Sequence, residues 1–219
     1  MARIVFDLDG TLVHSLPSIA SAGNALMAEL GRPALPEATV SGFVGQGAGR
    51  LVERMLGATG GPPDGNPAPL LARYHEIYDA DPVSGTAAYA HVPEVLARLA
   101  SAGHGLAVCT QKTVAPARRV LTVLGLMPPV TGLSGGDSIG VMKPDPRILH
   151  HAADQLAPGP VVLVGDSETD AATARAAGVP FLLHTPGYRH ASVAEIAPDA
   201  AFDDFRDLPA LVEGLVLPA

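Results

Sequence analysis

The stretch that decides the fold lies at the start of the chain: Arg3-Ile4-Val5-Phe6-Asp7-Leu8-Asp9-Gly10-Thr11-Leu12. Its first residues are rich in apolar and β-branched side chains, which is typical of a buried strand. The dipeptide Asp9-Gly10 is a strong turn signal, so the strand ends in a loop there. We therefore expect a buried first strand whose carboxyl end presents two aspartates.

The chain after Pro93 alternates between strand-like and helix-like segments. Apolar strands are expected at 106–109, 161–164 and 179–183, and helices near 93–102, 114–124, 145–156 and 168–177. Strands that alternate with helices predict a parallel sheet covered by helices on both faces. The fold class that follows is α/β, with a Rossmann-like core.

The span from residue 15 to residue 89 has a different pattern, because its apolar residues recur at helical spacing. Gly31-Arg32-Pro33 and Gly60-Gly61-Pro62-Pro63 separate the expected helices, and we predict no strand in this span. The prediction is a core domain of residues 1–14 and 90–219 with an inserted all-helical domain at 15–89. From about Phe202 the tail is expected to form a last connection and a helix.

Composition excludes several kinds of protein. The 219 residues carry a formal net charge of −8, which argues against binding of nucleic acid by bulk attraction. No apolar run approaches the roughly 20 residues of a membrane helix, and no basic and apolar leader begins the chain, so we expect a cytoplasmic protein without a membrane partner. The single cysteine, Cys109, excludes an internal disulfide framework and a cysteine-based zinc cluster.

Polar side chains are expected where the strands end. Asp7 and Asp9 follow the first strand, Thr110 the second and Asp166 a later one, and Lys143 precedes that strand in a loop. Ligands of open parallel sheets bind at the carboxyl ends of the strands. Carboxylates suit Mg²⁺ and a lysine suits a phosphoryl group, so the set indicates phosphoryl transfer.

Each of these residues also has a purely structural interpretation when it is taken alone. Asp9-Gly10 is then an ordinary turn, Thr110 a helix cap and Lys143 a solvated charge. Asp166 and Asp170 would favour the start of a helix, because carboxylates there complement the helix dipole. Only the combination of these residues favours chemistry.

Four motifs resemble those of the haloacid dehalogenase superfamily, in that family's order and across nearly the whole chain. They are Asp7-Leu8-Asp9-Gly10-Thr11-Leu12, Thr110, Lys143-Pro144-Asp145-Pro146 and Gly165-Asp166-Ser167-Glu168-Thr169-Asp170. The resemblance implies a phosphatase in which Asp7 attacks phosphorus and forms an aspartyl phosphate. It also implies that Asp9 protonates the leaving oxygen and then deprotonates water.

The resemblance further implies a cofactor and a set of binding residues. Mg²⁺ would be held by Asp7, the main-chain carbonyl of Asp9 and Asp166, with Asp170 either a ligand or a partner of the ligands. The phosphoryl group would be bound by Gly10, Thr11, Thr110 and Lys143. The helical insert would be a cap that closes over this site, with hinges near residues 14–15 and 84–85.

Segments on the substrate side resemble those of phosphoglycolate phosphatases. The first is Gly42-Phe43-Val44-Gly45-Gln46-Gly47, followed by Arg50. The second is Thr110-Gln111-Lys112 through Arg118, where the relatives more usually have Asn in place of Gln111. The stretch 164–174 through Gly187-Tyr188-Arg189 resembles them too. The implied substrate is 2-phosphoglycolate, which carries a carboxylate as well as a phosphate. A helix that begins near Gly47 would offer free amides to an anion, and Arg50 would pair with the carboxylate unless it faces solvent. Gly45 and Gln111 would lie against the same substrate.

Proteins with other functions can share this fold. A dehalogenase does not use a second aspartate as acid and base, and a phosphonate hydrolase needs a cap lysine, which residues 14–90 lack. A phosphatase of another small phosphate and a sugar phosphomutase would keep every core motif. A catalytically idle binding module is the alternative outside enzymes. The sequence does not determine the oligomeric state.

Overall fold

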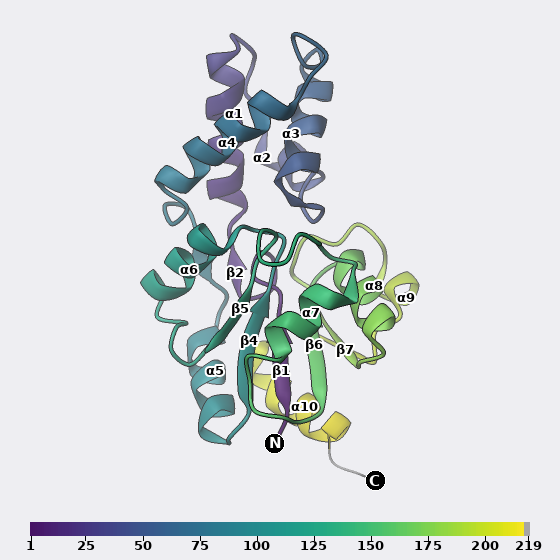
Figure 1. Ribbon diagram of the computed structural model, residues 1–219. Coiled ribbons are helices and arrows are strands. Elements are labelled where there is room, and N and C mark those ends of the chain that lie inside the picture. The colour runs from purple at the N-terminus through teal and green to yellow at the C-terminus, as the bar shows by residue number, and fades with distance from the viewer. Residues whose placement is uncertain (217–219) are drawn as a thin grey trace.

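A parallel sheet with helices on both faces forms the larger part of the molecule, and a group of helices stands on one end of it (Figure 1). The computed structural model describes residues 1–216. The sheet order is β5-β4-β1-β6-β7-β8, and every neighbouring pair is parallel. The strands are β1 (Arg3–Phe6), β4 (Gly105–Cys109), β5 (Gly132–Ser134), β6 (Val161–Gly165), β7 (Phe181–His184) and β8 (Ala200–Phe202). This arrangement confirms the expected α/β class with a Rossmann-like core.

Alternation along the strands divides the core into two layers, because successive strand side chains point to opposite faces. Ile4 and Phe6 of β1 pack on one face against α5 (Val92–Ser101) and α6 (Val114–Val123). Val5 packs on the other face against α7 (Pro146–Ala153) and α8 (Glu168–Ala177). The core also contains α9 (Val193–Ile196) and α10 (Leu208–Val216), with a short 3-10 helix at Phe205–Asp207. β1 is therefore a central strand, buried on both faces.

The helical insert has an apolar cluster of its own. It consists of α1 (Leu16–Glu29), α2 (Glu37–Ser41), α3 (Gly47–Ala58) and α4 (Ala68–Ala80). Leu26, Met27, Met55 and Leu56 are buried between these helices. One residue of the larger part, Tyr188, joins the same cluster. We call the insert the cap from here on.

Three short strands differ from the sequence-based expectation. β5 and β8 were not predicted. Each has three residues and begins with glycine or alanine, which are uncommon in strands, so neither sequence indicates a strand by itself. Ala87–Ala88 (β3) pairs with Val13–His14 (β2), so the expectation that 15–89 contains no strand was wrong. This two-stranded ribbon connects the cap to the core beside the expected hinges.

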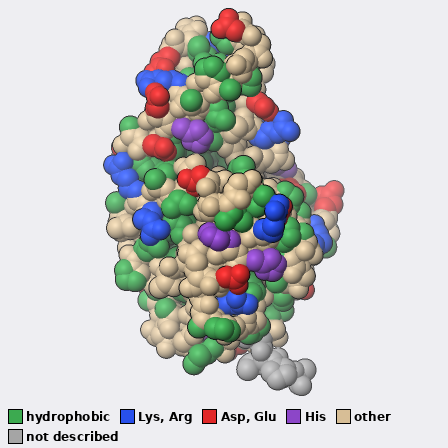
Figure 2. All heavy atoms as spheres, in the orientation of Figure 1, with side chains coloured by type: hydrophobic (Ala, Val, Ile, Leu, Met, Phe, Trp, Pro, Cys, Tyr) green, Lys and Arg blue, Asp and Glu red, His purple; other side chains and the backbone are tan. Residues whose placement is uncertain are grey.

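The surface carries charges of both signs. On the face shown in Figure 2, acidic and basic side chains are interspersed, and basic residues form no continuous stripe. Within residues 1–216, no helix combines the length and the apolar character that a membrane crossing requires.

The central position of β1 gives a prediction on stability. Ile4→Ala removes a side chain with 0% exposure, so we expect the free energy of unfolding to fall by about 2–5 kcal/mol. Ile139→Ala is the matched control, because Ile139 is 38% exposed, and about 1 kcal/mol or less is expected there. Urea unfolding followed by circular dichroism measures both. Equal losses for the two variants would contradict the burial of β1.

Candidate active site

The first strand and the turn after it place the two aspartates of the first motif. The Asp7 amide donates to the Val164 carbonyl, which continues the pairing of β1 with β6 beyond Phe6. Gly10 adopts φ +85°, a left-handed conformation that side chains disfavour, and its amide closes the turn on Val13. The chain therefore reverses just after Asp9, and Asp7 stays at the sheet edge.

Lys143 joins two carboxylates at this edge. Its Nζ lies 2.8 Å from Oδ2 of Asp7 and 2.6 Å from Oδ1 of Asp170, and its side chain is 1% exposed. Burial alone would lower the pKa of Lys143, but Asp170 and Asp7 outweigh that effect and raise the pKa. The ammonium is therefore a fixed positive charge in the site.

Asp166 and Asp170 occupy the end of β6 and the first turn of α8. Asp166 accepts hydrogen bonds from the Thr11 hydroxyl at 2.9 Å and from the Tyr188 amide at 2.6 Å. Asp170 forms a capping box with Ser167, whose hydroxyl donates to Oδ2 of Asp170 at 2.6 Å. Both oxygens of Asp170 are thus engaged, one with Ser167 and one with Lys143.

The site fits a divalent metal ion. Oxygens of Asp7, Asp166 and Asp170 lie within 4.8 Å of one another, and all three residues are buried. Burial raises the pKa of Asp7 to about 7 against the opposing effect of Lys143, and it raises the pKa of Asp166 well above its usual value. One ammonium does not balance three buried carboxylates. Hard oxygen ligands with an excess of negative charge are what Mg²⁺ requires.

The side chain of Asp9 lies outside this acidic cluster. Its Oδ1 accepts hydrogen bonds from Ser15 Oγ at 2.5 Å and from Lys112 Nζ at 2.6 Å. Within residues 1–216, Oδ2 of Asp9 accepts no hydrogen bond. One oxygen is therefore held in place and the other is available to a ligand. Ser15 was not predicted to belong to the site, and Lys112 was predicted only as part of the segment 110–118 on the substrate side.

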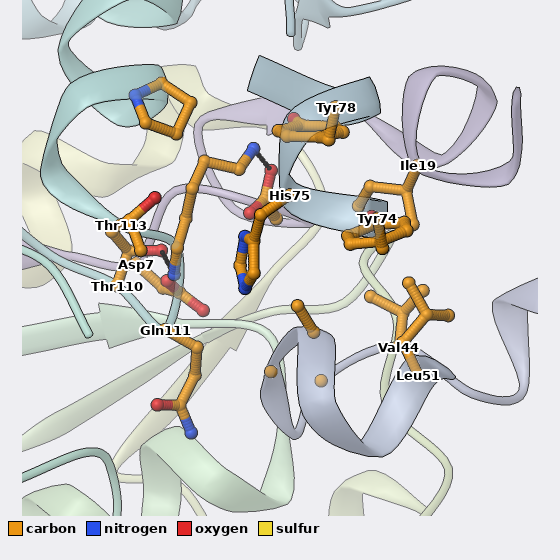
Figure 3. Close-up of a pocket in the computed structure, with 16 residues that line it drawn as sticks. Asp7, Ile19, Val44, Leu51, Tyr74, His75, Tyr78, Thr110, Gln111 and Thr113 are labelled. Carbon is orange, nitrogen blue, oxygen red and sulfur yellow. Dashed lines mark hydrogen bonds and ion pairs between the residues drawn. The ribbon is translucent and has the colours of Figure 1, made fainter. Parts of the chain in front are cut away.

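Residues that follow β4 line a cavity between the core and the cap (Figure 3). Thr110 is buried at the cavity wall, and its hydroxyl accepts from the Lys112 amide. The N-terminal capping position of α6 is occupied by Thr113, so Thr110 does not cap that helix. Gln111 donates from Nε2 to the Lys143 carbonyl, which ties this loop to the lysine loop. Aromatic residues of α4 and apolar residues of α1 and α3 form the opposite wall.

The residues expected on the substrate side are divided between two hollows. Gly45 and the start of α3 at Gly47 line the cavity with Asp7 and Asp9. Arg50 lines a second hollow with Gln111 and Lys143. The Arg50 side chain is 65% exposed and pairs with Glu53 at 2.8 Å.

Gly10 and Thr11 are placed behind the aspartates. A Cβ at Gly10 would overlap the carboxylate of Asp166, and the Thr11 hydroxyl is already bonded to that carboxylate. The structure thus brings together Asp7, Asp9, Gly10, Thr11, Thr110, Gln111, Lys143, Asp166 and Asp170 at one edge of the sheet. Tyr188 belongs to a stretch that the sequence singled out, but no role was predicted for it, because its contact with Asp166 depends on an amide whose position no side-chain pattern reveals.

A family model described as "Haloacid dehalogenase-like hydrolase" matches residues 4–184. The chain is a haloacid dehalogenase-like hydrolase. That match spans the site residues described above from Asp7 to Asp170 and ends at the last residue of β7, four residues before Tyr188. The fold and the motifs of this hydrolase therefore agree.

Relatives of this hydrolase share its full length. A phosphoglycolate phosphatase of Cereibacter sphaeroides (strain ATCC 17025 / ATH 2.4.3) is 42% identical over 217 residues, which cover 99% of this chain and 100% of the relative. One from Rhodospirillum rubrum is 42% identical over 212 residues, covering 94% and 88%. The crystal structure of a predicted phosphoglycolate phosphatase from Haemophilus somnus 129PT matches with a TM-score of 0.87 at 29% identity, covering 96% and 97%. Cap and core are thus both shared with these proteins.

The close approach of Gly187 to Asp166 gives a prediction on metal binding. A Cβ at position 187 would overlap Asp166, so Gly187→Ala must displace that carboxylate. We expect Mg²⁺ affinity to fall by about tenfold or more. Gly57→Ala is the matched control, because a Cβ there meets nothing within 4 Å and α3 continues through it. Titration calorimetry with Mg²⁺ measures both, and equal affinities would show that Asp166 tolerates the shift.

Proposed function

We propose that this hydrolase is a Mg²⁺-dependent phosphomonoesterase that cleaves 2-phosphoglycolate to glycolate and phosphate. The observation that carries the reaction class is the placement of Asp7. Its carboxylate lies at the cavity, 2.8 Å from a buried ammonium and within a cluster that fits a divalent cation. The names of the full-length relatives support the substrate.

In the first step, an oxygen of Asp7 attacks phosphorus, and the bond from phosphorus to the leaving oxygen breaks. An aspartyl phosphate forms on Asp7, and Asp9 gives its proton to the departing alkoxide through the oxygen that Ser15 and Lys112 leave free. Lys143 and the Thr110 hydroxyl bind the phosphoryl oxygens. Their positive and donor groups lower the repulsion between the carboxylate and the phosphate.

In the second step, Asp9 takes a proton from a water molecule, and the resulting hydroxide attacks phosphorus. The phosphoryl bond to Asp7 breaks and the free carboxylate returns. Mg²⁺, held by Asp7, the main-chain carbonyl of Asp9 and Asp166, would supply positive charge to the phosphoryl oxygens in both steps. We assign Asp170 to holding Lys143, because its Oδ1 accepts from the Lys143 ammonium at 2.6 Å while its Oδ2 accepts from Ser167 at the start of α8.

The substrate assignment depends on the cap, and two alternatives use the same core. A phosphatase of another small phosphate would differ only in the residues that face the leaving group. A sugar phosphomutase would return the phosphoryl group to a sugar rather than to water. We propose that Gly45 and Gln111 contact the substrate. We also propose that the protein acts in the cytoplasm.

The nucleophile assignment predicts the effect of one substitution. Asp7→Asn should reduce turnover by about 10³-fold or more, because an amide does not form the phosphoryl intermediate. Asp154→Asn is the control, since the Asp154 side chain is 74% exposed and its ion pair is with Arg3, away from the cavity. Rapid quenching and mass spectrometry should find one phosphoryl group on Asp7 of the wild type. A catalytically idle binding module would show neither turnover nor adduct.

The substrate and metal assignments are tested together with a panel of small phosphates. The highest kcat/KM is expected for 2-phosphoglycolate, and chelation by EDTA should abolish turnover until Mg²⁺ is added back. Free phosphate and the organic product are measured separately. Transfer of phosphate to a sugar instead of its release would favour the phosphomutase.

A further inference from the structure

Lys112 is a buried cation that the reaction above does not use directly. The chain has two lysines, and the other, Lys143, is engaged by Asp7 and Asp170. The Lys112 side chain is 7% exposed, and its Nζ lies 2.6 Å from Oδ1 of Asp9. Burial would lower the pKa of Lys112, but Asp9 and Tyr78 together outweigh that effect and raise the pKa.

The ammonium has hydrogen-bonding capacity to spare. An ammonium carries three donors, and among residues 1–216 only Asp9 accepts from this one. Lys112 also lines the cavity that contains Asp7 and Thr110. A buried, charged donor that faces a cavity with free N–H groups is suited to an anionic ligand.

Two tyrosines of the cap lie next to the Lys112 ammonium. Lys112 Nζ lies 5.0 Å from the centroid of the Tyr78 ring in α4, and Tyr74 stacks on Tyr78 with 6.0 Å between the ring centroids. The Tyr78 hydroxyl is buried and has no hydrogen-bond partner among residues 1–216. An unpartnered donor thus lies close to the ammonium, on the cap side of the cavity.

Resting on the proposed function, we propose that Lys112 is the specificity-determining residue that binds the carboxylate of the substrate. In a 2-phospho-carboxylate one carbon separates the carboxylate from the ester oxygen, and that oxygen faces Asp9 during proton transfer. A second carboxylate so close to Asp9 is repelled whenever Asp9 is ionised, unless a cation lies beside both. Lys112 is that cation, and the Tyr78 hydroxyl is a second donor to the same group.

Arg50 is the competing candidate for this role, and its position is less suitable. It lines the second hollow rather than the cavity beside Asp9, it is mostly exposed, and Glu53 occupies it. A charge in water contributes little to discrimination between a charged and a neutral substrate. A buried ammonium discriminates strongly, because a neutral ligand leaves its donors unpaired.

The test compares 2-phosphoglycolate with 2-hydroxyethyl phosphate, in which a neutral hydroxymethyl group replaces the carboxylate. The measured quantity is the ratio of kcat/KM for the acid to kcat/KM for the alcohol. Lys112→Met should lower this ratio by about tenfold or more, mainly through KM for the acid. Lys112→Arg keeps the charge and should keep the ratio within about threefold of wild type. Arg206→Met is the matched control, since Arg206 is exposed and pairs with Asp204 outside the site.

Three different results would contradict either the role of Lys112 or the proposed substrate, and each can be told from the others. Equal losses on both esters in Lys112→Met, with a wild type that prefers the acid, would show that Lys112 acts only by positioning Asp9. If the ratio falls in Arg50→Met but not in Lys112→Met, Arg50 rather than Lys112 binds the substrate carboxylate. A wild type that does not prefer the acid would overturn the substrate assignment itself. If circular dichroism shows that Lys112→Met is unfolded, the same measurements are made on Lys112→Gln and judged by the same criteria.

Discussion

The ion pairs of Lys143 are the interaction on which the site depends. Burying three carboxylates at one sheet edge is unfavourable, and the raised pKa values of Asp7 and Asp166 express that cost. Lys143 offsets part of it by contacting Asp7 and Asp170 at once. Removing one partner of such a buried pair typically costs about 3–5 kcal/mol, because the other charge stays buried and unpaired. The remaining excess of negative charge is what a divalent cation neutralises.

The fold supplies this arrangement because the carboxyl ends of parallel strands meet at one edge. β1 lies between β4 and β6, so Asp7, Thr110 and Asp166 follow three adjacent strands. Small residues let the backbones approach: a Cβ at Gly165 would overlap Asp170, and one at Gly187 would overlap Asp166. The acidic groups are therefore fixed by main-chain geometry. Differences in substrate choice must then come from the residues of the cap that line the cavity.

Local patterns in the sequence were sufficient for the core site but not for what lies around it. β1 and Asp7 were predictable, since an apolar run that ends in Asp-Gly is a signal contained in a few residues. The pair of Asp9 and Lys112 was not, because 103 positions separate its members and only the packing of β4 against β1 brings them together. Arg50 shows the reverse case: its place at the start of α3 followed from the sequence, but its engagement with Glu53 depends on which way the side chain turns.

The two lysines divide the charge of the site in a way that bears on selectivity. Asp7, Asp9, Asp166 and Asp170 face Lys112 and Lys143. Before Asp9 takes up the proton that it donates in the first step, the ionised side chains leave two negative units, which a divalent cation cancels. A site of net zero charge attracts no anion from a distance, and its selectivity must come from where the positive groups stand. One ammonium lies by the nucleophile and the other by the acid, at opposite ends of the bond that breaks. A substrate with anionic groups on both sides of that bond meets a cation at each end, whereas a simple phosphate ester meets only one.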